Sequence, residues 1–212
     1  MDCCQCKGIE TLFNQKEAEN KLKDYRKDGP AKTTRMLIEA LKAEGIEGTT
    51  LLDIGGGVGA IQHELLRAGV EKATGVDAST AYVKAAQEEA EHQGHAGRIT
   101  YHHGNFVDVA PQIEPAEIVT LDRVICCYHD MQALVGLSVA KAGRLYGLVY
   151  PRDTWWMRAA IYLANLYFRV VRNPFRTFIH PTQAVEALVR GNGFEQRFYK
   201  TSGPWQVVVY AR

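Results

Sequence analysis

The stretch TTLLDIGGGVGAIQHELLRAG, residues 49–69, decides the fold of this chain. An apolar run ends at Asp53, glycines follow at positions 55, 56, 57 and 59, and a helical pattern begins after them. A glycine-rich turn between a strand and a helix lets a ligand approach the bare backbone and directs the first N–H groups of the helix toward it. The stretch therefore predicts the first strand–turn–helix unit of an α/β domain, with a ligand bound over the turn.

The rest of the chain continues the alternation of strand and helix patterns. The expected strands are 49–54, 73–77, 98–102, 116–122 and 144–150. The expected helices between them are 59–68, 79–93 and 130–142, and four more helices are expected at 9–28, 31–44, 154–172 and 182–191. Such alternation predicts right-handed crossovers and a parallel sheet. The last two runs, FEQRFYK and WQVVVYAR, are close enough to form a terminal hairpin.

Length, charge and cysteine content limit the functional classes. The chain has 212 residues, a formal net charge of +1 and five cysteines. This length suffices for one domain with a substantial core, and the near-neutral charge gives no support to nucleic-acid binding. The start, MDCCQCKGIE, lacks the apolar region of a signal peptide, and cysteines in two tight clusters are typical of reduced thiols. We therefore expect a cytoplasmic protein with no nucleic-acid partner.

Three kinds of ligand bind over such a turn. A Walker-type phosphate loop requires Gly-Lys-Ser/Thr, and no lysine follows Gly59. The dinucleotide pattern G-x-G-x-x-G/A is satisfied by Gly55, Gly57 and Ala60, so the pattern alone leaves an NAD-binding oxidoreductase open. A carboxylate at Asp53 would repel a pyrophosphate, whereas it would favour a ligand with an ammonium and a sulfonium group. S-adenosylmethionine is such a ligand and carries no phosphate.

Four motifs in order resemble the class I S-adenosylmethionine-dependent methyltransferases: LLDIGGGVGA, GVDAS, HHGNFVDV and EIVTLDRVICCY. The resemblance runs from about residue 30 to the C-terminus. It implies a Rossmann-like fold with a seven-stranded, mostly parallel sheet, helices on both faces and an antiparallel C-terminal strand. It also implies a helical lid at 1–45, a single cofactor-binding domain at 46–212, and a helical substrate-cap insertion at about 151–180.

The resemblance assigns the cofactor site residue by residue. Asp53, Gly55 and Gly57 match the first motif, and Asp77 matches the acid that binds the ribose hydroxyls. Ala78 and Phe106 are expected beside the adenine, together with Asn105, which replaces the acid usual in relatives. The remaining expected cofactor contacts are Leu121 and Arg123 at the end of the fourth strand, and Tyr25 and Arg26 of the lid.

Methyl transfer requires a base only if the acceptor loses a proton. The candidates for catalysis are His129, Tyr128 and Asp122, which follow or end the fourth strand, and His129 is preferred because histidine titrates near neutrality. The alternative is that His129 or Asp130 only caps a helix. His180, just before Pro181, is a second histidine to consider, and it more simply precedes a helix that Pro181 opens. No metal ligand set is expected.

The segment 151–180 interleaves aromatic residues with arginines. Aromatics at helical spacing are usually core residues, but the same pattern fits an apolar cap over a flat or lipophilic acceptor, or a helix resting on a membrane surface at 155–172. The helical insertion followed by FIHP is loosely similar to the magnesium-protoporphyrin O-methyltransferases. The leading prediction is a methyltransferase that transfers the methyl of S-adenosylmethionine to a small molecule by in-line displacement.

The cysteines leave a second enzyme class open. Cys126 and Cys127 are expected near the methyl donor, and Cys3, Cys4 and Cys6 gather at the N-terminus. A methyltransferase for a soft thiol or metalloid acceptor would use cysteines at its active site. A further alternative is a protein that binds the cofactor without catalysis. The acceptor and the oligomeric state are not predicted.

Overall fold

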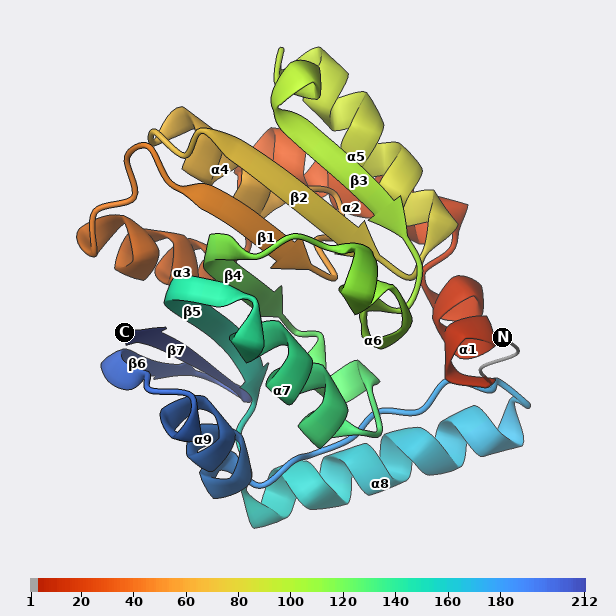
Figure 1. Ribbon diagram of the computed structural model, residues 1–212. Helices are drawn as coiled ribbons and strands as arrows, with labels where there is room; N and C mark the ends of the chain where they lie inside the picture. The colour runs from red at the N-terminus through yellow and green to blue at the C-terminus, as the bar shows by residue number, and fades with distance from the viewer. Residues whose placement is uncertain (1–3) are drawn as a thin grey trace.

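The computed structural model describes residues 4–212, and side chains from residue 7 onward. Its centre is a seven-stranded sheet with the order β3-β2-β1-β4-β5-β7-β6 (Figure 1). The strands are β1 (Thr50–Ile54), β2 (Lys72–Asp77), β3 (Ile99–His103), β4 (Ala116–Asp122), β5 (Ala142–Pro151), β6 (Glu195–Ser202) and β7 (Trp205–Ala211). β7 pairs antiparallel with both β5 and β6, while β1 to β5 pair in parallel. The predicted fold class, with its antiparallel terminal strand, is confirmed.

Helices cover both faces of the sheet. They are α1 (Cys4–Leu12), α2 (Gln15–Asp28), α3 (Lys32–Ala43), α4 (Ala60–Arg67), α5 (Thr80–His92), α6 (Phe106–Val109), α7 (Met131–Ala140), α8 (Trp155–Val170) and α9 (Thr182–Gly191). One core cluster joins α3 and α4 to the sheet through Leu37, Leu41 and Leu65. The other joins α7 and α9 through Leu134, Val135 and Val185. The sheet is therefore the middle of three layers.

Two helices of the N-terminal segment lie toward the carboxyl ends of the strands, and the third belongs to the core. α1 is so close to the chain after α8 that a Cβ on Gly8 would lie 2.6 Å from the Phe175 backbone. α2 packs on α5, and Leu22 is buried there. α3 instead packs flat on the sheet, where Leu37 and Leu41 are fully buried against β5 and β7. The segment predicted as a lid therefore contains two helices, α1 and α2, whose residues line the cavity described below, and one core helix, α3; the role of a lid stays a prediction.

The boundaries of most elements agree with the sequence prediction to within a few residues. α9 and β4 have the predicted ranges. The single helix predicted at 9–28 is wrong: it is two helices, α1 and α2. Asn14 separates them because its side chain accepts a hydrogen bond from the Glu17 N–H at 3.2 Å and begins a new helix. The short α6 was not predicted, because four residues are too few to produce a helical period.

α8 lies outside the three layers, along the lower edge of the molecule in Figure 1. Met157 is its one buried residue. Within the described part of the chain, none of the helices combines the length and the apolarity that spanning a bilayer requires. The position of α8 matters below, because its inner face reaches the candidate site.

Candidate functional site

A cavity of about 970 Å³ lies at the carboxyl ends of β1, β2 and β4. Parallel strands bring their carboxyl ends to one edge of the sheet, so residues that are distant in sequence meet there. Eleven of the fourteen predicted site residues line the cavity: Tyr25, Asp53, Gly55, Gly57, Asp77, Ala78, Asn105, Phe106, Asp122, Arg123 and Tyr128. Its volume is in the range of sites for drug-sized ligands.

The glycine turn between β1 and α4 forms the floor of the cavity. Gly55 has φ +64°, and a Cβ there would lie 2.4 Å from a methyl group of Val124. Gly57 has φ +56°, and its N–H donates to the Asp77 carboxylate at 3.0 Å. Side chains rarely adopt positive φ, so this backbone path requires glycine. The turn therefore presents bare backbone to the cavity, as the sequence predicts.

Asp53 lies beneath the turn rather than at its mouth. Its side chain is buried, and its two oxygens accept hydrogen bonds from Thr120 Oγ1 at 2.7 Å and Gln62 Nε2 at 3.0 Å. Burial raises the pKa of this carboxyl to about 7, although both hydrogen bonds favour the charged form. Asp53 consequently connects β1 to β4 and α4 through hydrogen bonds. Any effect of its charge on a ligand must act across the backbone of the glycine turn.

Asp77 ends β2 and points into the cavity beside the turn. Its oxygens accept hydrogen bonds from Gly57 N–H at 3.0 Å and Ser79 N–H at 2.8 Å. Burial raises its pKa to about 6. Each carboxylate oxygen has a second lone pair, so Asp77 keeps acceptor capacity for the hydroxyl groups of a ligand. This geometry agrees with the predicted ribose contact.

The wall expected to hold the adenine comes from the chain after β2 and the chain after β3. Ala78 and Phe106 line it, and Phe106 is anchored in the core. Asn105 begins α6, where its side-chain oxygen accepts from Val107 N–H at 3.4 Å and its amide donates to the Tyr128 hydroxyl at 3.2 Å. Asn105 thus connects the predicted adenine wall to Tyr128 on the opposite side.

A cluster of charged and hydroxyl groups stands at the end of β4. Asp122 Oδ2 accepts a hydrogen bond of 2.5 Å from Thr34 Oγ1, while its buried Oδ1 has no hydrogen-bond partner. Burial raises the pKa of Asp122, and the neighbouring Arg123 guanidinium opposes this effect. Arg123 adopts φ +62°, unusual for a residue other than glycine, donates to Thr33 Oγ1 at 2.6 Å and stacks over Trp205. Backbone strain of this kind is concentrated at functional sites.

The two candidate histidines do not line the cavity. His129 packs beside Tyr128, with ring centroids 5.1 Å apart, and the next residue, Asp130, caps α7 by accepting from Ala133 N–H. His180 Nε2 lies 2.9 Å from the carbonyl oxygen of Tyr128 and 3.1 Å from that of Ile125. A ring nitrogen between two carbonyls must donate, so His180 holds the turn η3 (Ile125–Cys127) in place.

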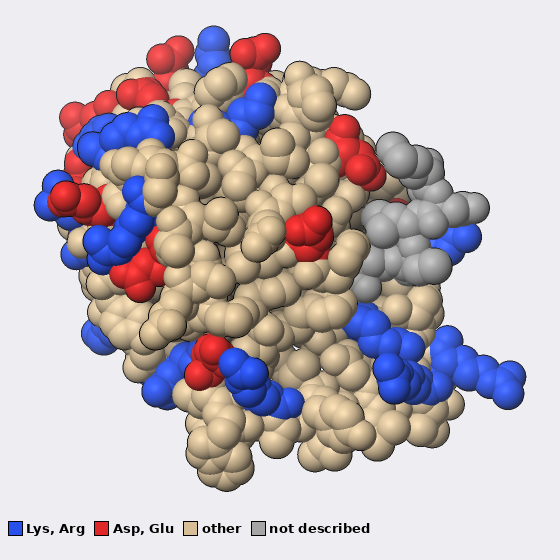
Figure 2. Space-filling view, turned by 60° about the horizontal axis from the view of Figure 1, so that its bottom comes forward, with Lys and Arg blue, Asp and Glu red and all other residues tan. Residues whose placement is uncertain are grey.

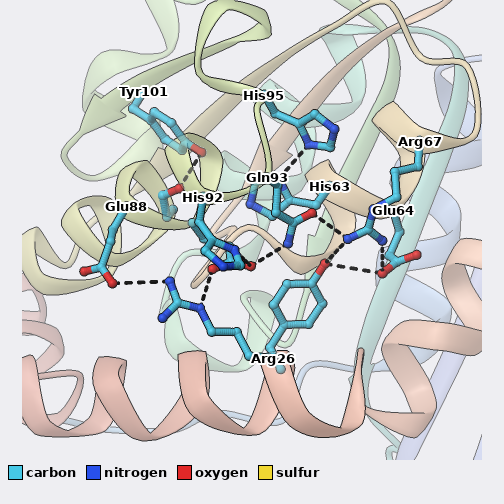
Figure 3. A network of polar contacts seen from close by, with 12 residues as sticks. Arg26, His63, Glu64, Arg67, Glu88, His92, Gln93, His95 and Tyr101 are labelled. Carbon is cyan, nitrogen blue, oxygen red and sulfur yellow. Dashed lines mark hydrogen bonds and ion pairs between the residues drawn. The ribbon is translucent and has the colours of Figure 1, made fainter.

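Two predicted cofactor contacts lie elsewhere. Arg26 points from α2 to α5, where its Nε is 2.7 Å from Glu89 and a terminal nitrogen is 3.3 Å from Glu88 (Figure 3). It is placed there because the helix turns successive residues about 100° apart, so Tyr25 and Arg26 diverge. Leu121 is completely buried in the core between sheet and helices, because its neighbour Asp122 takes the cavity-facing position of the strand.

Several cavity residues were not among the predicted site residues. Phe13, Phe168 and Phe175 form an apolar wall in which Phe175 makes edge-to-face contacts with the other two rings. Thr34 approaches Asp122 from 88 positions away in the sequence. No local pattern relates these residues to the glycine turn. The amphipathic spacing of the helices was the available signal, and it indicates only that one face is covered.

The cysteines of the runner-up prediction are partly described. Cys126 and Cys127 line the cavity, with their sulfurs 3.9 Å apart. The neighbouring thiol and burial both raise the pKa of Cys126 well above its usual range, so this thiol stays protonated. Cys3 and the side chains of Cys4 and Cys6 lie outside the described residues.

A buried histidine pair behind the site makes the stability of the protein depend on pH. The Nδ1 atoms of His63 and His95 are 3.1 Å apart, and Tyr25 stacks on His63 from the cavity side (Figure 3). Burial lowers the pKa of His63 to about 4 from 6.5, helped by His95 and Arg67 and opposed by Glu89 and Glu64. Between about pH 4 and pH 6.5, His63 is therefore protonated in the unfolded chain but neutral in the folded chain. Stability is complete above pH 6.5 and is lost as the pH falls toward 4.

Because of His63, we expect the free energy of unfolding to be about 2 kcal/mol lower at pH 5 than at pH 7, as measured by urea denaturation at both pH values. His63→Gln should lose correspondingly less over the same interval. His92→Gln is the matched control, because the His92 side chain is exposed on α5 and should leave the pH profile unchanged. Equal losses in wild type and His63→Gln would contradict the assignment.

Comparisons with known proteins agree with the fold. Residues 51–141 match the family described as methyltransferase domain. The magnesium protoporphyrin IX methyltransferase of Synechocystis PCC 6803, solved with bound S-adenosylhomocysteine, superposes with a TM-score of 0.75 at 18% identity, over 98% of this chain and 99% of that chain. An O-methyltransferase family protein from Burkholderia thailandensis gives 0.71 at 17% identity, over 96% and 62%.

A curated relative matches by sequence over a shorter length. It is the ribosomal protein L11 methyltransferase of Enterobacter sp. (strain 638), 25% identical over 117 residues. The match covers 55% of this chain and 39% of the relative, so the chain matches well under half of that enzyme's length. The matched part carries a methyltransferase domain, which agrees with the family that the four motifs resemble.

Proposed function

We propose, for a chain that belongs to the class I S-adenosylmethionine-dependent methyltransferases, that it transfers a methyl group to a small-molecule acceptor. The observation that carries this proposal is the Asp77 carboxylate, held by Gly57 N–H in a cavity whose floor is the glycine turn. An acid at this place accepts hydrogen bonds from the vicinal hydroxyls of a ribose. The same residues give no donor cluster for a pyrophosphate, because the nearest charged groups at the turn, Asp53 and Asp77, are acids.

The residues of the cavity fit S-adenosylmethionine. Gly55 and Gly57 leave backbone where a side chain would otherwise stand, Asp77 takes the ribose, and Ala78, Asn105 and Phe106 take the adenine. When bound, this cofactor would supply a methyl group already activated on a sulfonium: an acceptor would attack the methyl carbon in line with the carbon–sulfur bond, and S-adenosylhomocysteine would be the leaving group. The protein must therefore chiefly orient the acceptor and exclude water. The phenylalanine wall and the helices α1 and α2 over the cavity serve the second purpose.

A proton acceptor, where the substrate needs one, is Asp122 rather than His129. Asp122 lines the cavity, its Oδ1 has no hydrogen-bond partner, and burial raises its pKa toward the range useful for a base. Thr34 fixes the other oxygen, and Oδ1 lies 3.7 Å from Arg123 Nε, so the orientation of the carboxylate is defined on both sides. Tyr128 lies opposite and is oriented by Asn105, which suits it to position the acceptor.

The acceptor side of the cavity favours a flat or apolar molecule. Phe13, Phe168 and Phe175 offer an apolar surface, and the charged residues around the same cavity carry both signs: Lys32, Arg35, Arg123, Asp24, Asp28 and Asp122. The two structural neighbours named above are a porphyrin methyltransferase and an O-methyltransferase family protein, consistent with a small aromatic acceptor. The cysteine-assisted alternative is less well supported, because a thiol as strongly protonated as Cys126 is a poor ligand for a metalloid.

Two measurements test the proposal. S-adenosylhomocysteine should raise the melting temperature of the protein while NADH should not, since only a ligand of the folded state stabilises it. Labelled methyl from the cofactor should then enter the small-molecule fraction of a cell extract. Stabilisation by NADH would favour the oxidoreductase, and label in the protein or RNA fraction would overturn the acceptor class. Cofactor binding with no transfer to any fraction would favour a binding protein without catalysis.

A further inference from the structure

Exposed apolar side chains are concentrated on one element of this protein. Of the ten large hydrophobic residues that the described chain exposes, eight lie between positions 155 and 171. Trp155 is 82% exposed and Val170 is 74% exposed, at the two ends of α8. Scattered exposed apolar residues are ordinary, but a continuous group of this size marks an interaction surface. We call the exposed side chains of 155–172 the α8 surface.

The orientation of α8 is fixed by its other face. Met157 is buried, and Ala164 and Phe168 line the cavity. Asn165 is bound in two directions: its amide donates to the Thr177 carbonyl at 2.7 Å and its oxygen accepts from the Thr177 N–H at 3.0 Å. The apolar residues of the α8 surface are therefore turned outward by a well-anchored helix.

The charges beside the α8 surface have a single dominant sign. Between positions 155 and 176 the chain carries four arginines and no acidic residue, although the net charge of the whole protein is only +1. Asp153 pairs with Arg158 at the start of the helix, and Arg169 and Arg172 are exposed at its end. Figure 2 shows the lower part of this face as mostly uncharged, with blue groups on both sides.

We propose that the α8 surface docks on an anionic lipid bilayer, with the helix lying in the interfacial plane. Tryptophan and tyrosine suit the headgroup region, the aliphatic Leu163 and Val170 suit the acyl boundary, and arginines bind lipid phosphates while their stems stay apolar. A second copy of this chain fits less well, because in a two-fold contact the same surface would offer the arginines no acidic residue between positions 155 and 176. The proposal does not depend on methyl transfer.

Docking of the α8 surface on a bilayer would place the cavity close to the membrane. The inner face of α8 lines the cavity through Ala164 and Phe168, so the bilayer and the cavity would lie on opposite sides of one helix. If the proposed function holds, a lipophilic acceptor in the bilayer would enter the cavity past the inner face of α8.

The test uses the full chain and sedimentation with vesicles. The protein should sediment with vesicles of phosphatidylcholine mixed with phosphatidylglycerol, should bind vesicles of phosphatidylcholine alone much more weakly, and should be released by high salt. Arg169→Gln should weaken binding about fivefold, as expected for one arginine at an anionic surface. Leu163→Glu, at a side chain that is 61% exposed, should weaken it more than tenfold.

Tyr199→Glu is the matched control, because Tyr199 is 50% exposed on β6 and should retain wild-type vesicle binding. The melting temperature of each variant is measured without and with S-adenosylhomocysteine. The value without the ligand reports folding, and the increase with the ligand reports cofactor binding. Absence of binding to the mixed vesicles, or equal binding by wild type and Leu163→Glu, would overturn the proposal. So would a wild-type dimer that Leu163→Glu converts to monomer, since a second copy would then cover the surface.

Discussion

Asp77→Ala is expected to weaken the binding of S-adenosylhomocysteine by roughly 10- to 150-fold, measured by isothermal titration calorimetry. The reason is the loss of charge-assisted hydrogen bonds from the two ribose hydroxyls to one carboxylate. The same carboxylate holds Gly57 N–H at 3.0 Å and Ser79 N–H at 2.8 Å, so its removal also loosens the turn that carries the ligand.

The stability of the ligand-free protein separates a binding defect from unfolding. Burial raises the pKa of Asp77 to about 6, above the ordinary value of 3.8, so ionisation of Asp77 opposes folding. Stability linked to this group is present below pH 3.8 and is lost as the pH rises through 6. Asp77→Asn retains an acceptor for Ser79 N–H but loses the one for Gly57 N–H, and at pH 7 it also removes the buried charge; these opposing effects should leave its melting temperature close to that of wild type while ligand binding is weak. An unchanged dissociation constant would show that Asp77 does not hold the ribose.

Asp53→Ala is expected to lower the free energy of unfolding by about 3–5 kcal/mol, measured by urea denaturation at pH 7. The substitution leaves Thr120 Oγ1 and Gln62 Nε2 buried without their acceptor, and each unsatisfied group costs about 1–3 kcal/mol. It also removes the link between β1, β4 and α4 directly under the glycine turn.

Asp53→Asn is the informative companion. The Gln62 Oε1 atom is buried without a hydrogen-bond partner, so the Gln62 amide can turn over and accept from the new side-chain amide. This variant should therefore stay within about 1 kcal/mol of wild type, because it keeps both hydrogen bonds. A loss as large as that of Asp53→Ala would show that the charge itself is needed for folding.

The same variant tests the electrostatic role that the sequence suggested for Asp53. S-adenosylmethionine carries the sulfonium charge, and S-adenosylhomocysteine lacks it. If the Asp53 carboxylate acts on that charge from below the turn, Asp53→Asn should weaken binding of the first more than of the second. Equal changes in the two dissociation constants would restrict Asp53 to its structural role.

Features that depend on neighbouring residues were predictable from the sequence. The strand β1, the glycine turn after it and the acid at the end of the next strand follow one another between Thr50 and Asp77. Their relative positions are set by backbone geometry and by the regular crossover between parallel strands. The family motifs likewise placed Asn105, Phe106 and Asp122 at strand ends, and the structure brings these residues to one cavity.

Features that depend on how helices dock were not predictable in this way. Arg26 and Tyr25 are adjacent, yet Tyr25 lines the cavity and Arg26 binds Glu89, because packing of α2 on α5 decides which direction each one faces. His129 has the expected position along the chain but lies off the cavity. Thr34 contacts Asp122 only because α3 packs on the sheet.

By itself, the sequence of this protein determined the α/β class, the glycine turn at the carboxyl end of β1 and the resemblance to methyltransferases. These depend on residue order and on conformations that single residues allow, such as the positive φ of Gly55. The tertiary structure alone decided which side chains close the cavity, that Asp53 supports the turn from beneath, and that α8 turns its apolar side outward. Those outcomes depend on the burial of whole faces, and a periodic pattern does not specify what each face meets.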